Sequence, residues 1–405
     1  MRRLALAGIA LALLLPTLAP AASEPAAATN AAYSRIDAAI DQAISEQRIV
    51  GAVVLVSRDG KLVYQRAAGF ADRESKRPMK LDAVFRLSSV SKPVVSAAAM
   101  VLVDQGKLSL DDPVTKWLPD FRPKLASGEA PTITVRQLLT HTSGLGYKFA
   151  EKPGSAYYQA GVSDGFDELR ISLDEEAQRL ASVPLFNKPG EGFRYSLSID
   201  VLGAVLEKAA GKALPQVVAE TVTQPLGMRD TGFWAKDPAR LAVPYHDAKP
   251  APAKMDDPWS MPFGEGGRMT YSPSRALDPK AFPSGGAGMV GTAPDIMRLL
   301  EAVRAGGKPI LKAETAASMM RNQIGALLAG PGTGFGFGGA VVVDPAATHT
   351  PQSAGTWQWG GVYGHSWFVD PARKLTVVAL TNTALEGMWG KFTTDVRDAT
   401  YESVK

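Results

Sequence analysis

A serine and a lysine stand three residues apart in the segment Ser89-Val90-Ser91-Lys92, which runs into the apolar stretch 94–102. That stretch is long and alanine-rich enough to predict a buried helix, and Pro93 fits its first turn. Residues three apart share a helix face, so both side chains should point to one place. A desolvated lysine can take the proton of a serine hydroxyl, and the helix N-terminus would offer N–H groups where an oxyanion forms. The pattern predicts acyl transfer through Ser89 with Lys92 as its activating partner.

Two further segments carry groups suited to the same chemistry. Tyr195 stands just before a helix predicted to begin at Ser198, and a phenol in a cationic pocket can act as general base and then as general acid. The run Trp359-Gly360-Gly361-Val362 contains two glycines, which let an edge strand approach a substrate and offer an N–H to a carbonyl oxygen. Each piece alone also fits a plain structural use: a helix cap beside a solvated lysine, a packing tyrosine, and a β-bulge.

The composition excludes several other classes of function. The chain has 405 residues, 45% of them hydrophobic and 21% charged, with a formal net charge of +4. No basic block or aromatic-basic stripe is present, so a nucleic-acid partner is not indicated. The absence of cysteine rules out disulfides and thiol chemistry. The four histidines are too scattered to indicate a zinc site: His141, His246, His349 and His365. We therefore expect a small-molecule substrate and neither cofactor nor metal.

The N-terminus resembles a targeting segment. Two arginines follow Met1, the stretch 4–15 is apolar, and Ala19-x-Ala21 fits a cleavage site. We predict a signal peptide over 1–22 and a disordered leader over 23–30, with export to the periplasm or the medium. An uncleaved membrane anchor is less favoured because Pro16 interrupts the apolar run, and the usual lipid anchor needs a cysteine.

Strand patterns occur at both ends of the chain and helical patterns between them. We expect an N-terminal helix through Ile36, Ile40 and Ile44, further helices at 172–180 and 198–210, and strands at 52–56, 62–64, 340–343, 366–369 and 375–380. A last helix should carry Met388, Phe392 and Val396, and 237–288 should form loops with short strands. The order predicts an α+β domain over 31–405. One antiparallel sheet would come from both termini (about 31–88 and 285–405), with a helical subdomain inserted at about 89–284.

These pieces together resemble the serine β-lactamase superfamily, specifically class C β-lactamases and family VIII carboxylesterases. Matching segments also occur at 135–145 (VRQLLTHTSGL), 224–228 (QPLGM) and 288–295 (GMVGTAPD), in the family's order. The resemblance implies a β-lactamase/transpeptidase-like fold. It makes Ser89 the nucleophile, Lys92 its activator, Tyr195 the general base and acid, and the backbone N–H groups of Ser89 and Val362 the oxyanion hole. His141 resembles a structural residue of the family, and His365 is not needed for a triad. The run Gly285-Gly286-Ala287-Gly288 lacks the Lys-Ser/Thr of a phosphate-binding loop, so we interpret it as backbone packing.

Four positions are expected to bind substrate, namely Leu197, Trp359, Gly360 and Gly361, and the chain departs from the class C pattern at the first three. Class C enzymes carry Tyr-x-Asn and Lys-Thr-Gly there, so an amide, a cation and a hydroxyl suited to a β-lactam are missing. Trp359 offers an apolar wall instead, as in family VIII esterases. We predict a serine hydrolase of carboxylic esters with short acyl chains. The alternatives are a β-lactamase, a D-Ala-D-Ala peptidase, an acyltransferase or a non-catalytic binding protein; retention of all three catalytic residues argues against the last.

Overall fold

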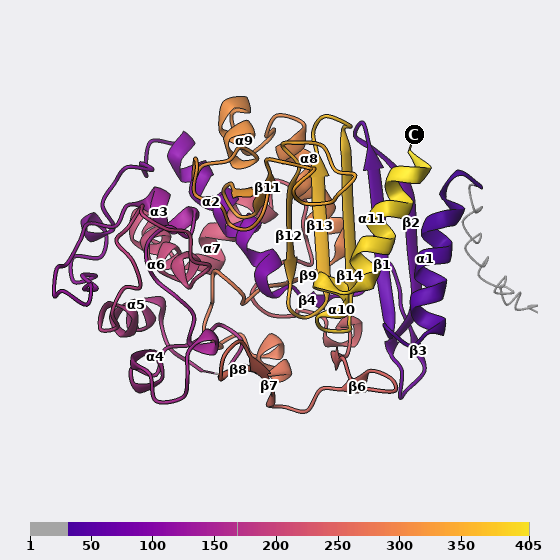
Figure 1. Ribbon diagram of the computed structural model, residues 1–405, viewed down its shortest axis with the longest axis horizontal. Coiled ribbons are helices and arrows are strands. Elements are labelled where there is room, and N and C mark those ends of the chain that lie inside the picture. Colours follow the sequence, from indigo (N-terminus) through magenta and orange to yellow (C-terminus); the bar gives the residue numbers. More distant parts are fainter. Residues whose placement is uncertain (1–30, 168, 405) are drawn as a thin grey trace, which may run out of the picture.

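One antiparallel sheet forms the half of the molecule that contains both ends of the described chain (Figure 1). The structure is a computed structural model that describes residues 31–167 and 169–404, so the predicted signal peptide and leader lie outside it. The strand order is β10-β11-β12-β13-β14-β1-β2-β3. The strands are β1 (Gly51–Arg58), β2 (Lys61–Asp72), β3 (Arg77–Pro78), β10 (Thr333–Phe335), β11 (Ala340–Val342), β12 (Trp357–Gly361), β13 (His365–Asp370) and β14 (Leu375–Thr381). The first strand pairs with the last, from Ala52 opposite Thr381 to Arg58 opposite Leu375, which confirms a sheet built from both termini.

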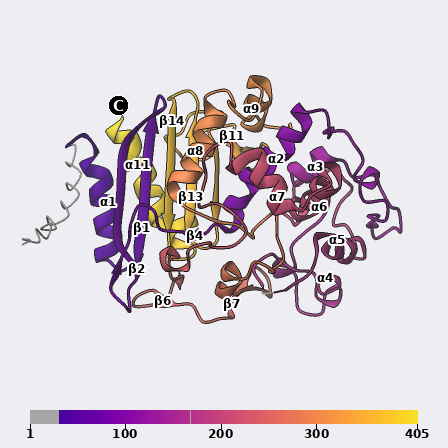
Figure 2. The same ribbon diagram turned by 180° about the vertical axis from the view of Figure 1, so that it is seen from behind.

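Both faces of the central strands β1 and β14 are buried along almost their whole length, and most of their residues are apolar. Val54 and Val56 pack on one side with α1 (Ser34–Ser45) and α11 (Lys391–Ser403). Val53 and Leu55 belong to the larger core on the other side, which includes α2 (Ser91–Asp104) and α8 (Ala293–Arg304). Figures 1 and 2 show α1 beside α11 on one face and α8 on the other. The turn between β1 and β2 has positive φ at Asp59 and Gly60, as a tight two-residue turn requires.

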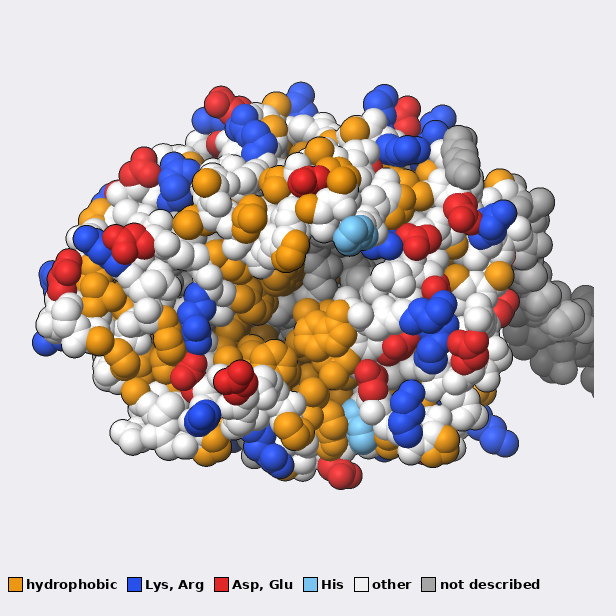
Figure 3. Space-filling view, viewed as in Figure 1, with side chains coloured by type: hydrophobic (Ala, Val, Ile, Leu, Met, Phe, Trp, Pro, Cys, Tyr) orange, Lys and Arg blue, Asp and Glu red, His pale blue; other side chains and the backbone are white. Residues whose placement is uncertain are grey.

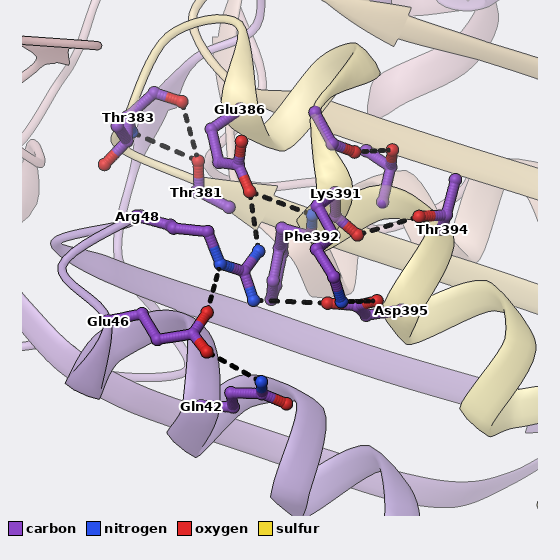
Figure 4. Close-up of polar contacts among 12 residues, drawn as sticks. Gln42, Glu46, Arg48, Thr381, Thr383, Glu386, Lys391, Phe392, Thr394 and Asp395 are labelled. Carbon is purple, nitrogen blue, oxygen red and sulfur yellow. Dashed lines mark hydrogen bonds and ion pairs between the residues drawn. The ribbon is translucent and has the colours of Figure 1, made fainter.

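An arginine joins the two termini outside the sheet (Figure 4). Arg48 follows α1 and donates to Glu46, to Glu386 at the start of α10 (Glu386–Trp389) and to Asp395 in α11, at 2.7, 2.7 and 3.2 Å. Only 15% of the Arg48 side chain is exposed, so these ion pairs are partly shielded from water. The contacts fix the segment that follows β14, which reaches the edge of the site described below.

The rest of the chain forms a helical region and irregular connections. The helices are α3 (Val135–Leu139), α4 (Ala156–Gln159), α5 (Leu173–Ala181), α6 (Ser198–Ala210), α7 (Leu214–Val218), the π-helical turn η5 (Ala219–Thr223) and α9 (Ala313–Met319). Short 3-10 turns are η1 (Ala31–Tyr33), η2 (Ser88–Val90), η3 (Val114–Lys116), η4 (Lys148–Ala150), η6 (Pro238–Arg240) and η7 (Pro273–Leu277). Strand pairs β4 (Phe85–Arg86) with β9 (Val290–Gly291), β5 (Tyr245–His246) with β6 (Ala253–Lys254), and β7 (Trp259–Phe263) with β8 (Gly267–Tyr271) complete the fold.

The predicted helices at 172–180 and 198–210 are confirmed. Ser172 Oγ accepts the Glu175 N–H at the start of α5, and α6 ends at Gly211 in the left-handed conformation with φ 66°. The expected short strands between 237 and 288 are β5 to β8. No helix within the described ranges is long and apolar enough to cross a membrane.

Two expectations about the C-terminal part need correction. The last helix is broken at Gly390, where any Cβ would lie 2.6 Å from the Glu386 backbone, so Met388 belongs to α10 and packs on the main core. The segment Trp359–Gly361 does not lead into a strand but ends β12, which is not an edge strand because it pairs with β11 and β13. However, β11 reaches only as far as Gln358, so the last three residues of β12 are free on that side.

Candidate active site

Ser89 and Lys92 meet at the start of the buried helix α2, as their spacing predicts. Ser89 lies in the turn η2 that leads into α2, and Lys92 Nζ donates to its Oγ at 3.3 Å. Ser88, immediately before, has φ 44°, a conformation that costs energy for a non-glycine residue and shows that the turn is held by its surroundings. Ser89 is 3% exposed and Lys92 is fully buried. Ser89 is therefore only slightly accessible from outside, and Lys92 lies behind it in the protein interior.

Three acceptors surround the Lys92 amine. Besides Ser89, its Nζ donates to Tyr147 Oη at 3.0 Å and to the Gly286 carbonyl at 2.8 Å. An ammonium group has three N–H donors, so these contacts satisfy it completely. A lysine without exposed surface needs such partners, because an unpaired charge is expensive to bury.

Tyr195 approaches Ser89 from the loop before α6. Its hydroxyl donates to Ser89 Oγ at 2.6 Å, and Lys92 Nζ lies 4.6 Å from the centre of its ring. Trp359 Nε1 donates to the same phenol oxygen at 3.4 Å. The phenol therefore lies within hydrogen-bond reach of the nucleophile, with the Trp359 N–H and the Lys92 ammonium beside it. This arrangement suits a group that takes a proton from Ser89 and later returns it.

Sequence reasoning missed Tyr147 and the Gly286 carbonyl. Burial raises the pKa of Tyr147 well above its ordinary value, and the neighbouring Tyr195 and Asp200 act in the same direction. Tyr147 thus stays a neutral phenol that accepts from Lys92, and it does not contact Ser89 among the hydrogen bonds of the described chain. The glycine run around Gly286, interpreted from the sequence as packing, is part of the site. The only available signal was that both segments adjoin stretches that match the family.

The end of β12 passes very close to the nucleophile turn. A Cβ on Gly361 would lie 2.5 Å from the Leu87 carbonyl oxygen, so only glycine permits this approach. The next peptide is tied to the same turn, since Tyr363 N–H donates to Ser88 Oγ at 3.4 Å. Val362 therefore lies beside the Ser89 turn, where the predicted oxyanion hole requires it; the role of its N–H remains a prediction.

Trp359 forms an aromatic wall next to Tyr195. Its ring centre lies 5.1 Å from that of Tyr195 and 5.3 Å from that of Phe335, which packs with Phe193. In Figure 3 the face over β12 is hollowed, and hydrophobic side chains gather around the hollow. A separate groove of about 350 Å³ lies over the Gly360 face of β12, beside Met388 and the exposed Trp389, and Ser89, Lys92 and Tyr195 are not among its lining residues.

The other two substrate-binding candidates lie elsewhere. Leu197 has no exposed surface and packs in the main core, so it does not line the site. Gly360 points to the opposite face of the sheet from Trp359 and Gly361, because side chains alternate along a strand. A Cβ there would lie 2.7 Å from the His365 carbonyl oxygen and 2.9 Å from Met388. Glycine at 360 thus reflects close packing rather than contact with a substrate.

Neither candidate histidine touches Ser89. His141 packs its ring 4.7 Å from that of Tyr195, and its Nδ1 binds Ser196. Burial, and then the charge of Lys92, lower the pKa of His141 well below its usual range, so it is neutral. His365 binds the Arg86 carbonyl through Nε2 at 2.8 Å, and burial lowers its pKa to about 4. Both histidines therefore pack near the site without contacting Ser89. The site geometry does not need a histidine of a triad to explain it.

Comparisons with known proteins agree with this geometry. The family model described as Beta-lactamase matches residues 36–398. Esterase EstB of Burkholderia gladioli is 54% identical over 390 residues, which cover 95% of this chain and 98% of EstB. The lovastatin esterase of Penicillium rubens is 28% identical, over 86% of this chain and 93% of that protein. The solved structure of "EstCE1, a hydrolase with promiscuous acyltransferase activity" superimposes with a TM-score of 0.88 at 50% identity, covering 91% of this chain and 98% of EstCE1. With this fold, and with a serine, lysine and tyrosine in mutual contact, the chain belongs to the Beta-lactamase family.

Proposed function

We propose that this protein is a serine hydrolase that cleaves carboxylic esters through an acyl-enzyme on Ser89. One observation carries the proposal: Ser89 Oγ lies 2.6 Å from Tyr195 Oη and 3.3 Å from Lys92 Nζ. A hydroxyl held between two proton-transfer groups, on a strained turn at a helix N-terminus, is an activated nucleophile. The similarity to EstB and EstCE1 supports ester hydrolysis rather than a purely structural use of this site.

The contacts define a two-step reaction. In the reactive form Tyr195 is a phenolate beside the Lys92 ammonium; it takes the proton of Ser89 while Oγ attacks the ester carbonyl, and the N–H groups of Ser89 and Val362 stabilise the resulting oxyanion. Collapse of this intermediate breaks the ester C–O bond, and the leaving alcohol takes the proton from Tyr195. A water molecule then repeats the sequence on the acyl-enzyme, which releases the carboxylic acid and regenerates Ser89.

The wall beside the nucleophile favours neutral substrates with short acyl groups. Trp359 occupies the position at which class C enzymes carry a lysine. An indole cannot balance the negative charge of a bound carboxylate, as that lysine would. A β-lactam brings such a carboxylate, whereas a simple ester has no charge to satisfy. The Trp359 ring packs against Tyr195 and Phe335, so the wall next to the nucleophile is aromatic and suits apolar groups.

Acyl transfer to an alcohol is the second candidate. The printed title of EstCE1 includes promiscuous acyltransferase activity. The physical argument is that an apolar wall next to the acyl-enzyme disfavours water relative to an alcohol with an apolar chain. Transfer would use the same steps, with the alcohol replacing water in the second.

The substrate preference is tested by kcat/KM for p-nitrophenyl acetate and for a chromogenic cephalosporin. We expect the ester to be preferred by a wide margin, and W359K to narrow that margin. W117K is the matched control, because Trp117 is half-buried at the end of η3, away from the site. A wild-type protein that already prefers the cephalosporin would overturn the esterase proposal in favour of a β-lactamase.

We also propose that the protein is exported after removal of its first residues. The support is the sequence pattern of residues 1–22 alone. N-terminal sequencing of the periplasmic or secreted protein should begin close to Ala22 or Ser23. Cytoplasmic protein that still starts at Met1 would contradict export.

A further inference from the structure

Asp200 is a buried carboxylate that the reaction above does not use. It lies on α6, one and a half turns beyond Tyr195, and is 1% exposed. Its Oδ1 accepts the Ser284 hydroxyl at 2.5 Å and the Gly286 N–H at 3.3 Å. Its Oδ2 has no hydrogen-bond partner among the described residues. A carboxylate with half of its oxygens unpaired is costly to bury, so a nearby positive charge is needed to explain it.

Residue Gly286 contacts both this carboxylate and the catalytic lysine. Its N–H binds Asp200, and its carbonyl accepts from Lys92 at 2.8 Å. A Cβ on Gly286 would lie 2.7 Å from Asp200 Oδ2 and 3.3 Å from Lys92 Nζ. The two charged atoms are therefore at most the sum of those distances apart, 6.0 Å. A side chain at 286 would collide with the carboxylate, so glycine is what permits this close approach of the two charges.

We propose that Asp200 is a positioning residue that supplies the counter-charge of Lys92 and holds the 284–288 turn so that the Gly286 carbonyl aims Lys92 at Ser89. This inference rests on the proposed role of Ser89. The Ser284 hydroxyl makes two hydrogen bonds that fix this turn: it donates to Asp200 and accepts from the Ala287 N–H at 3.0 Å. The three acceptors of Lys92 are all neutral, so Asp200 is the group that balances its charge.

The electrostatics of the surroundings agree with this pairing. Burial raises the pKa of the Asp200 carboxyl, while the Ser284 hydrogen bond and the charge of Lys92 act to lower it. The other titratable groups that face the pair are Tyr147, Tyr195 and His141 around Lys92, and Arg275 and Glu176 around Asp200. Of these, Arg275 is the only other cation, and its guanidinium donates to the carbonyls of Asp167 and Phe282 rather than to Asp200.

The test is the pH dependence of kcat/KM for D200N with p-nitrophenyl acetate. Asparagine keeps the shape of the Asp200 side chain and one carbonyl acceptor but removes its negative charge. We propose that this charge favours the protonated state of the cluster formed by Ser89, Lys92 and Tyr195. The acid limb of the profile should therefore move to lower pH. Coulomb's law at 6.0 Å with an effective dielectric constant of about 20 gives a shift of about two pH units.

A second variant separates position from charge. S284A keeps the carboxylate and removes the hydroxyl that joins it to the turn, so at pH 8 kcat should fall by about tenfold with KM nearly unchanged. D295N is the matched control. Asp295 is also 2% exposed and accepts from Asp230 N–H and Thr231, but it lies on α8 and contacts no catalytic residue. D295N should lower the melting temperature and leave the acid limb in place.

Each outcome supports or overturns the inference. A folded D200N with an unshifted acid limb overturns the counter-charge, and an S284A with wild-type kcat overturns the positioning of the turn. If D200N does not fold, the S284A result alone decides between a positioning and a merely structural Asp200. Wild-type turnover and labelling of Ser89 test the proposed function separately, so its failure is distinguishable from a failure of this inference.

Discussion

Tyr195→Phe should cost far more activity than Tyr147→Phe, although both phenols lie against Lys92. Tyr195 Oη is 2.6 Å from Ser89 Oγ, so it can carry the proton between nucleophile and leaving group. Tyr147 Oη is 3.0 Å from Lys92 Nζ and has no hydrogen bond to Ser89. The two rings are 5.3 Å apart and chemically identical, so the comparison isolates the proton path from general packing.

The expected magnitudes follow from what each hydroxyl does. Loss of a general acid–base group lowers kcat by roughly 10² to 10⁴-fold, which we expect for Tyr195→Phe. Loss of one hydrogen bond to a charged group costs about 1.5–3 kcal/mol, of which a buried lysine that readjusts recovers a part. We therefore expect Tyr147→Phe to lower kcat/KM by about ten- to a hundredfold.

The assay compares p-nitrophenyl acetate with ethyl acetate. Nitrophenolate leaves without protonation, whereas ethoxide requires an acid. Tyr195→Phe should therefore depress turnover of the ethyl ester much more than that of the nitrophenyl ester, and Tyr147→Phe should depress both equally. A larger loss in Tyr147→Phe, or a Tyr195→Phe defect that does not depend on the leaving group, would refute the assigned roles.

Three more predictions concern specificity and stability. The combined exchange W359K, G360T and L197N, which would restore the class C residues, should lower the melting temperature and acylate a cephalosporin no faster than W359K alone, because a side chain at 360 collides with the His365 carbonyl and an amide at 197 is buried in the apolar core. Burial raises the pKa of Glu176 from its ordinary 4.5 to about 9, so the folded state keeps a proton that the unfolded state loses across that range. Stability should fall as pH rises from 4.5 to 9, and E176Q should flatten this dependence in thermal melts. R48M should cost about 1–3 kcal/mol in urea unfolding, with kcat/KM retained, because it breaks the partly buried contacts that join the termini.

Patterns within short segments predicted the core of the fold and of the site. The spacing of Ser89 and Lys92 fixes their common direction, and apolar runs at both ends of the chain predicted strands that do pair, as β1 with β14. Tyr195 was found because its segment adjoins a clear helix start.

Features that depend on tertiary packing could not be predicted from the sequence. Tyr147 and Gly286 reach Lys92 from loops 55 and 194 residues away, and no local pattern reports such a contact. Leu197 adjoins a catalytic residue in sequence but turns into the core, and Gly360 alternates away from the site on β12. In both cases motif position indicated the segment correctly but not the direction of the side chain.

The most direct test of the account is the site of covalent labelling by a fluorophosphonate ester. The intact protein should gain the mass of one adduct, and peptide mapping should place it on Ser89, which the contacts with Lys92 and Tyr195 make the activated hydroxyl. Ser89→Ala should neither label nor hydrolyse esters while keeping the wild-type melting temperature within a few degrees. An adduct on Ser143 or Ser366, or full ester turnover by Ser89→Ala, would contradict the central claim.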